Sequence, residues 1–348
     1  MGPIQLEPNK VAAELSRFGE KLAKGMNVLK NVPDVHYGAS DKEAIYKEDK
    51  LVVYRFKSAH KVTHKTPLLI AYALVNRPYM VDLQDDRSIV KSLLAAGHDV
   101  YLIDWGYPDP SDRYVTLDDY INGYLRRSVK AVSKHTGVDK INLLGICQGG
   151  AFSLCYASLY PETLQNLITM VTPVDFQTPD NMLSHWTQGM DVDLFIDTLG
   201  NVPADLMNWC YLTLKPYRLL QQKYVGMTDI LDNPGEMENF LRMEKWIFDS
   251  PDQAGEAFRQ FIKDFYQGNK LLKGGLKIGE KAIDLKAIKL PILNIFAEQD
   301  HLVPPDASRA LRALSGTDDY TELSFKGGHI GIYVSSRAKQ VPETTHDR

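Results

Sequence analysis

The chain has 348 residues, of which 44% are hydrophobic and 24% are charged, and its formal net charge is -4. This balance lacks the basic stripe of a nucleic-acid binder, and no run of about 18 apolar residues predicts a membrane span. No basic segment followed by an apolar stretch predicts a signal peptide, and three scattered cysteines are too few for a disulfide framework. We therefore expect a cytoplasmic chain with one large α/β domain carrying an insertion, or with two domains.

The first predicted element is an amphipathic helix over about residues 8–30. Apolar residues recur there at spacings of three and four, from Val11 to Leu29. We expect this helix to pack on its own domain, and a docking surface for another chain is the alternative.

Short apolar runs then alternate with helical patterns. The predicted strands are Leu51–Phe56, Leu68–Leu74, Val100–Trp105, Ile141–Ile146, Leu167–Val174, Ile292–Ala297 and Tyr320–Phe325. Helical patterns cover Ser88–Ala96, the segment from Thr116 to about His135, and the residues after Cys147. This alternation predicts an α/β fold whose mainly parallel sheet is flanked by helices.

The alternation stops between Phe176 and Ala287, a stretch rich in aromatic residues with few strand-like patterns. We interpret residues 176–287 as a mostly helical cap, or lid, inserted into a core made of 1–175 and 288–348. Within it, Ser250 and Pro251 predict a helix start, with serine as N-cap and proline in the first turn. A packed subdomain without a gating role is the alternative.

The sequence Gly145-Ile146-Cys147-Gln148-Gly149-Gly150 directly follows the predicted buried strand Ile141–Ile146. The spacing G-x-C-x-G between a strand and a helix predicts a nucleophile elbow, in which small residues allow a sharp turn that exposes the central side chain. Cys147 is therefore the candidate nucleophile. The other two cysteines, Cys155 and Cys210, are predicted to be small buried hydrophobic residues.

A nucleophile of this kind needs a base and an acid that orients it. Asp300 follows the strand Ile292–Ala297, and His329 follows the strand Tyr320–Phe325. The order nucleophile, acid, base is that of α/β-hydrolases, and all three residues would lie at the carboxyl ends of strands. We predict that His329 takes the thiol proton and that Asp300 holds the imidazole in the required tautomer.

Other residues compete for these roles. His301, next to Asp300, is a secondary candidate for the base. Asp306 and Asp175 are rivals for the acid, although neither directly follows a late strand.

Two backbone N–H groups are expected to stabilise the oxyanion. One belongs to Gln148, the residue after the nucleophile, and the other to Val75 in the loop Tyr72–Asn76 after an early strand. The glycines of a lipase-type loop are missing there. No metal site is predicted.

A cysteine nucleophile favours thioester chemistry. Attack on an acyl thioester gives another thioester, so the acyl group stays activated and can pass to a hydroxyl. From these residues alone, an acyltransferase and a thioesterase are nearly equal predictions, and a catalytically silent binding module is a third.

Several motifs together resemble the polyhydroxyalkanoate synthases from about residue 40 to residue 334. They are Tyr72–Tyr79, Tyr101–Gly106, Leu117–Tyr120, Gly145–Gly150, Asp300–His301 and Gly327–His329. By this resemblance Cys147 is the nucleophile, and Asp300 and His329 complete the triad. The short length and the sequence Phe261–Gln267 are most similar to the class III catalytic subunit, with class IV as the alternative.

The resemblance implies polymerisation of (R)-3-hydroxyacyl-CoA, chiefly (R)-3-hydroxybutyryl-CoA, into polyester with release of CoA. The CoA thioester is then the substrate, and no cofactor is expected. Implied partners are a second copy of the chain and a non-catalytic PhaE-type subunit, at the surface of polyhydroxyalkanoate granules in the cytoplasm. A thioesterase or polyester depolymerase is the alternative. The tail Val341–Arg348 departs from the family, which usually ends in an amphipathic helix with a Trp-Leu pair.

Overall fold

The computed structural model describes residues 38–215, 217, 223–231 and 233–334, together with the single residues 13, 16 and 20. Apart from those three residues, the helix predicted over 8–30 lies outside the described part of the chain, and so does the tail 341–348. The chain divides into two compact units. One contains Gly38–Met207 and the described residues from Asp249 onward, and the other contains Asn208–Phe248. The predicted cap, 176–287, contributes to both units, and its role as a lid stays a prediction.

A sheet of eight strands forms the centre of the larger unit. Its strands are β1 (Lys42–Glu48), β2 (Leu51–Phe56), β3 (Leu68–Ala71), β6 (Val100–Asp104), β7 (Ile141–Ile146), β8 (Leu164–Met170), β11 (Ile292–Ala297) and β12 (Tyr320–Phe325). They lie in the order β1-β2-β6-β3-β7-β8-β11-β12. β2 runs antiparallel to β1 and β6, and every other pair of neighbours is parallel. The predicted mainly parallel sheet is confirmed.

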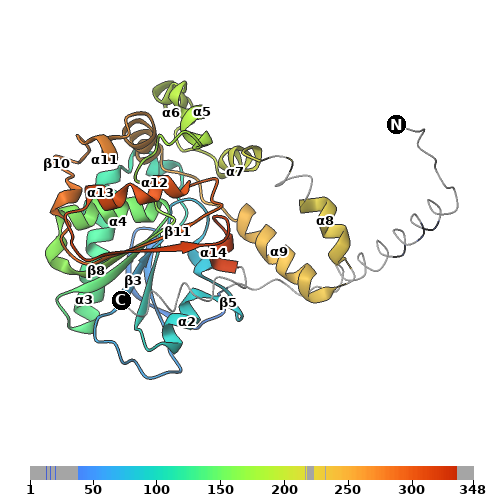
Figure 1. Cartoon of the computed structure of the whole chain (residues 1–348), viewed down its shortest axis with the longest axis horizontal. Helices are drawn as coiled ribbons and strands as arrows, with labels where there is room; N and C mark the ends of the chain where they lie inside the picture. Colours follow the sequence, from blue (N-terminus) through green and yellow to red (C-terminus); the bar gives the residue numbers. More distant parts are fainter. Residues whose placement is uncertain are drawn as a thin grey trace. The chain divides into compact units, whose positions relative to one another are not determined.

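Helices lie on both sides of the strands (Figure 1). α2 (Ile89–Ala95) is on one side, and α4 (Gln148–Leu159) is on the other. α4 and α3 (Arg126–Thr136) share one hydrophobic cluster with alternate strand residues such as Leu69 and Leu143. Because successive side chains of a strand point to opposite faces, the residues between them pack on the other layer. Both faces are therefore buried, as the near-continuous apolar runs predict.

The sequence did not predict β1, in which only Ala44–Tyr46 are apolar and a pair of charged residues stands on either side. Most of this strand is exposed at the edge of the sheet, so burial imposes no hydrophobic pattern on it. Two other strands were predicted to extend too far at their carboxyl ends. β3 stops at Ala71 and β8 at Met170, because the chain turns away from the sheet after both.

Short helices fill the stretch between β8 and β11. They are α5 (Met182–Gln188), α6 (Val192–Leu199), α7 (Ala204–Thr213), α8 (Lys223–Ile230), α9 (Pro234–Phe248), α10 (Gly255–Gln260), the π-helix η6 (Phe261–Gln267) and α11 (Lys270–Lys273). The helix predicted to start at Ser250 and Pro251 is wrong. The chain is not helical there, Gln253 forms a backbone bridge with Val202, and α10 begins only at Gly255.

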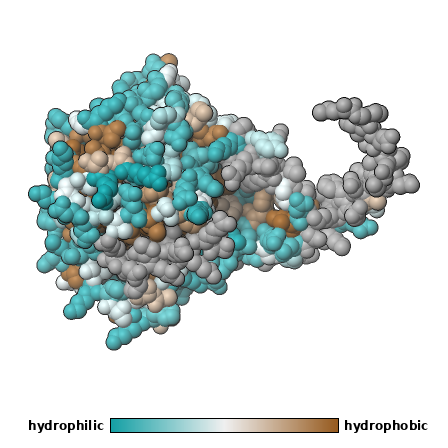
Figure 2. All heavy atoms as spheres, in the orientation of Figure 1, coloured by the Kyte–Doolittle hydropathy of each residue, from teal (hydrophilic) through white to brown (hydrophobic). Residues whose placement is uncertain are grey.

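Further short helices follow the last two strands of the sheet. α12 (Pro305–Arg309) and α13 (Leu311–Leu314) connect β11 to β12, and α14 (Gly331–Val334) follows β12. Among the described helices none has the length and apolar character to cross a membrane. The face drawn in Figure 2 is mostly hydrophilic, with hydrophobic residues gathered in small patches.

Candidate active site

Cys147 stands at the turn between β7 and α4, at the carboxyl edge of the sheet. Its backbone has φ 54° and ψ -122°, a conformation that residues with a Cβ seldom adopt. Three hydrogen bonds hold this backbone. Cys147 N–H donates to the Met170 carbonyl at 2.9 Å, and the N–H groups of Gly150 (2.9 Å) and Ala151 (3.3 Å) donate to the Cys147 carbonyl. Strain of this kind is typical of a nucleophile elbow.

Two glycines allow this turn to pack closely on its neighbours. A Cβ on Gly149 would lie 2.3 Å from the Ala71 carbonyl oxygen and 2.4 Å from that of Tyr72. A Cβ on Gly150 would lie 1.8 Å from the Thr172 hydroxyl. The start of α4 therefore touches the end of β3 directly, which places the loop after β3 next to the elbow.

Asp300 and His329 meet at the same edge of the sheet. The two side chains come from the loops after β11 and β12, and His329 Nδ1 lies 2.6 Å from Asp300 Oδ2. The other carboxylate oxygen accepts hydrogen bonds from the N–H groups of Leu302 (2.8 Å) and Val303 (2.9 Å). Both side chains are buried. Since a carboxylate only accepts, Nδ1 carries the hydrogen, and Nε2 is left for a second partner.

That second partner is the Cys147 thiol. Burial alone would lower the pKa of the His329 imidazole, but the charge of Asp300, the charge on the Cys147 sulfur and hydrogen bonds to both residues raise this pKa well above its usual value. These neighbours therefore favour the imidazolium, which is the form of His329 that holds the thiol proton.

The rival candidates lie elsewhere. His301 is only partly buried, and the imidazole that pairs with Asp300 is that of His329. Asp306 is exposed and pairs with Arg309 at 3.2 Å. Asp175 accepts hydrogen bonds from the Asn269 side chain (2.8 Å) and the Gln177 N–H (2.9 Å).

The two expected oxyanion donors belong to chain segments that touch. Gln148 is the first residue of α4, so its N–H has no carbonyl partner within the helix. Its side chain reaches the loop after β3, where Gln148 Oε1 accepts a hydrogen bond from Leu74 N–H at 3.1 Å. The next N–H belongs to Val75, and among the hydrogen bonds of the described residues none uses it.

Three tyrosines lie within the electrostatic influence of the Cys147 sulfur, and sequence reasoning gave none of them a role. Tyr72 and Tyr333 are buried, and Tyr266 is partly buried. Burial, and then the negative charge on Cys147, raise the pKa of Tyr72 and of Tyr266. Burial, Tyr72, Cys147 and Asp300 raise the pKa of Tyr333. The Tyr72 and Tyr333 rings lie 6.4 Å apart. Their hydroxyls stay protonated, so this part of the site is aromatic and uncharged.

Tyr266 lies in the π-helix η6, a type of turn that often occurs at functional sites. Its carbonyl accepts hydrogen bonds from the side chains of Gln177 and Gln188, both at 3.0 Å. Its ring packs edge-on against Phe176 with centroids 5.0 Å apart. The tyrosine is thus held on both its backbone and its ring. In the sequence, Tyr266 belongs to the motif Phe261–Gln267. That motif indicates the family but does not predict that this tyrosine lies near Cys147.

The other two cysteines differ from Cys147. Cys155 is fully buried in α4, and burial raises its pKa. Burial also raises the pKa of the half-buried Cys210. A raised pKa makes a thiol a poor nucleophile at neutral pH. The predicted burial is confirmed for Cys155, whereas Cys210 is only partly buried.

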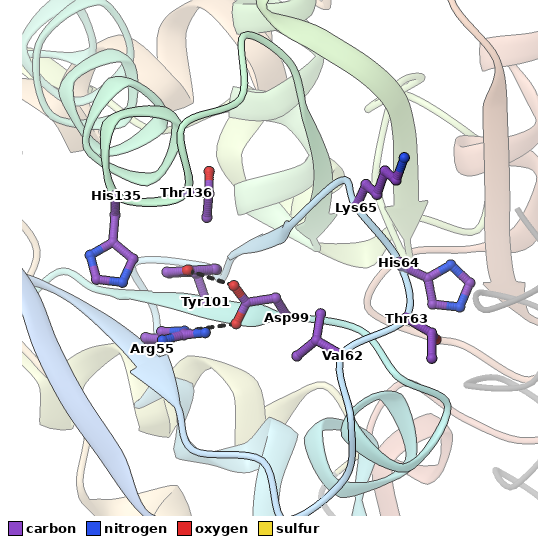
Figure 3. Close-up of a pocket in the computed structure, with 9 residues that line it drawn as sticks. All are labelled: Arg55, Val62, Thr63, His64, Lys65, Asp99, Tyr101, His135 and Thr136. Atoms are coloured by element: carbon purple, nitrogen blue, oxygen red, sulfur yellow. Dashed lines mark hydrogen bonds and ion pairs between the residues drawn. The ribbon is translucent and has the colours of Figure 1, made fainter.

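A cavity of about 370 Å³ lies next to the amino ends of strands β3 and β6 (Figure 3). Its lining consists of Arg55, Val62, Thr63, His64, Lys65, Asp99, Tyr101, His135 and Thr136. Asp99 accepts hydrogen bonds from Arg55 Nε and from the Tyr101 hydroxyl, both at 2.8 Å. Thr63–Lys65 precede β3 and Asp99 precedes β6, whereas Cys147 follows β7. Since these strands are parallel, the cavity and the sulfur lie at opposite edges of the sheet.

The chain is similar in sequence to a known family and to several named proteins. A family model described as the alpha/beta hydrolase fold matches residues 66–336. Two proteins named poly(3-hydroxyalkanoate) polymerase subunit PhaC, from Allochromatium vinosum and Thiocystis violacea, are each 60% identical to this chain, over 98% of it and 96% of their own length. A protein of the same name from Synechocystis is 51% identical over 93% of this chain and 88% of its own.

Among solved structures, a monoacylglycerol lipase of Paleococcus ferrophilus superposes with a TM-score of 0.52 over 85% of this chain and 97% of its own, at 15% identity. That likeness concerns the fold alone. With these matches over nearly its whole length, the chain belongs to the α/β-hydrolase fold family and, within it, to the poly(3-hydroxyalkanoate) polymerase PhaC subunits.

Proposed function

We propose that this chain is a catalytic subunit that polymerises (R)-3-hydroxyacyl-CoA, chiefly (R)-3-hydroxybutyryl-CoA, into polyester with release of CoA. The observation that carries the proposal is the 60% identity, over 98% of the chain, to proteins named PhaC polymerase subunits. The pairing of His329 with Asp300 next to Cys147 supports it.

In the first step, His329 Nε2 takes the thiol proton and the Cys147 sulfur attacks the thioester carbonyl of the substrate. The carbon–sulfur bond to CoA then breaks, and CoA leaves as a thiol with the proton that His329 returns. The acyl group stays on Cys147 as a new thioester. The N–H groups of Gln148 and Val75 are proposed to stabilise the negative oxygen of the intermediate.

In the second step, the hydroxyl of another hydroxyacyl group attacks the acyl thioester on Cys147. An oxygen ester forms, and the hydroxyl proton passes to the sulfur and regenerates the thiol. We assign the transfer of this proton to His329. Asp300 Oδ2 already pairs with His329 Nδ1 and Oδ1 with two backbone N–H groups, whereas the other side of the imidazole meets Cys147.

The free energies of the two transfer steps explain why such an enzyme would use a cysteine nucleophile. Exchange of one thioester for another is close to thermoneutral, whereas formation of the oxygen ester is downhill. A serine would lose this drive at the first step. Transfer must also outpace hydrolysis. The buried Tyr72 and Tyr333 and the partly buried Tyr266 support the proposal, because aromatic rings near the sulfur would keep water away from it.

We further propose that the chain acts as a homodimer with a PhaE-type second subunit, at the surface of polyhydroxyalkanoate granules in the cytoplasm. The motif Phe261–Gln267, similar to class III subunits, supports this assignment. The CoA thioester is the substrate, and the proposed reaction requires no cofactor or metal.

A thioesterase or polyester depolymerase is the second candidate, because the same triad could deliver the acyl group to water. The test supplies (R)-3-hydroxybutyryl-CoA to the full chain, with and without the second subunit, and follows both CoA and the acyl product. We expect CoA release with insoluble polyester. Free 3-hydroxybutyrate as the main product would reject the synthase and favour the hydrolase.

Cys147→Ala provides the control. It should abolish CoA release and leave the circular dichroism spectrum unchanged, whereas Cys147→Ser should retain very little activity because an alkoxide is much harder to form than a thiolate. Substantial polymerisation by either variant would contradict the covalent mechanism.

A further inference from the structure

We propose that Gln253 is a positioning residue for the oxyanion hole, and that its side-chain amide sets the direction of the Val75 N–H. The inference rests on the proposed acyl transfer at Cys147, in which that N–H is one of two donors. It concerns a residue far from the elbow in sequence, in the segment where a helix was predicted.

The decisive contact is made to the peptide group that joins Leu74 to Val75. Gln253 Nε2 donates a hydrogen bond to the Leu74 carbonyl oxygen at 3.0 Å. That carbonyl and the Val75 N–H belong to one planar unit, and in a trans peptide they point in opposite directions. A group that fixes the carbonyl therefore also fixes where the N–H points.

Gln253 is itself immobilised. Its side chain is buried, with 4% of the residue exposed, and its own N–H and carbonyl both pair with Val202 at 2.9 Å. The amide nitrogen also faces the Pro251 carbonyl at 3.3 Å. Because both neighbours are carbonyl oxygens, only the donor side of the amide can face them.

The same extended segment holds the residue after Val75. Asn76 adopts φ 61°, and its side-chain nitrogen donates to the Ser250 hydroxyl at 2.6 Å. On the other side, Leu74 N–H donates to the Gln148 side chain at 3.1 Å. Val75 is thus flanked by two anchored residues, and its N–H is the donor that no described hydrogen bond consumes.

No described hydrogen bond of Gln253 reaches Cys147 or His329, so Gln253 would act only through the loop. This separates its expected effect from that of the triad. Acylation by a thioester develops charge on a carbonyl oxygen and needs the oxyanion donors. Alkylation by iodoacetamide occurs at a saturated carbon and needs only the activated thiol.

The experiment compares the two reactions in the wild type and in Gln253→Met, which keeps the length of the side chain and removes the donor. Rapid-quench mass spectrometry of the full chain gives the rate of acylation by (R)-3-hydroxybutyryl-CoA and by a small acetyl thioester, and separately the rate of iodoacetamide alkylation. The matched control is Gln260→Met, because Gln260 also bonds a backbone group, the Leu117 N–H at 2.8 Å, away from the elbow.

We expect Gln253→Met to slow acylation by about tenfold to a hundredfold, somewhat less than deletion of an oxyanion donor costs, with iodoacetamide alkylation unchanged. Gln260→Met should leave both rates unchanged. Unaltered acylation in Gln253→Met, or an equal fall in acylation and alkylation, would overturn the inference. If the wild type accepts the acetyl thioester but not the hydroxyacyl one, the proposed substrate fails while the role of Gln253 is still decided. If it accepts neither, both proposals fail.

Discussion

At the scale of single residues, the contact between Asp300 and His329 governs the proposed chemistry. The carboxylate is held by two backbone N–H groups on one oxygen and meets the imidazole with the other. It therefore acts both as a fixed support for the ring and as a charge that stabilises the imidazolium.

Asp300→Asn tests this contact. The charge that raises the pKa of His329 is lost, so this pKa should fall, and the amide can hold the wrong tautomer. We expect the rate of CoA release to fall by on the order of a thousandfold or more, as for other orienting acids. The pKa itself is read from the imidazole resonance in an NMR titration of Cys147→Ala with and without Asp300→Asn. An unchanged pKa would contradict the electrostatic role of Asp300.

The positions of Cys147, Asp300 and His329 were predictable from the sequence because each residue follows a predicted strand, and these strands end at the same edge of the sheet. The tyrosines and Gln253 were not. Tyr266 and Gln253 come from the stretch between β8 and β11, where no periodic pattern relates sequence position to distance from Cys147. Gln253 contacts the loop after β3 rather than the elbow itself. Contacts of this kind depend on tertiary packing, which one sequence does not reveal.

At the scale of elements, the start of α4 is the tightest junction in the site. Gly149 lies against the carbonyls of Ala71 and Tyr72, which belong to the end of β3 and the loop that follows. Backbone carbonyls cannot rotate away as a side chain can. The helix and the strand are therefore locked at the distance that glycine allows.

Gly149→Ala should therefore destabilise the protein by about 1–3 kcal/mol, the usual cost of overpacking, and should also slow acylation because the loop after β3 is displaced. Gly189→Ala is the control, since a Cβ at Gly189 meets nothing within 4 Å and its φ of -93° suits any residue. Urea unfolding midpoints of the two variants provide the comparison. Equal midpoints would contradict the close approach.

The elements themselves were predicted with uneven success. Strands buried on both faces, such as β7 and β11, were placed correctly. A short, nearly continuous apolar run is typical of such a strand, and the polar residues on either side mark its ends. The segment 249–254 was misread as the start of a helix. Ser250 and Pro251 do form a common helix-start pattern, but the polar groups of Ser250 and Gln253 are used on the loop after β3 instead.

At the scale of the whole molecule, the buried pair of His329 and Asp300 makes stability depend on pH. The pKa of His329 is raised in the folded state. Its contribution is therefore fully present below the unfolded value of about 6.5 and is lost as the pH rises through the folded pKa.

We therefore expect the melting temperature of the wild type to lie above that of His329→Gln. The difference should be largest near pH 6 and should shrink as the pH rises. Glutamine fills the site without titrating. Melting temperatures of both proteins across this pH range provide the measurement, in one buffer series of constant ionic strength. A difference that grows toward alkaline pH would contradict the sign of the shift.

The position of β12 at the edge of the sheet has a consequence for biosynthesis. The loop that supplies His329 follows this strand, so a ribosome that has made the chain through the loop after β11 has already produced the nucleophile and its acid but not the base. In the proposed mechanism the thiol therefore lacks its base until the edge strand β12 and the loop after it have been made.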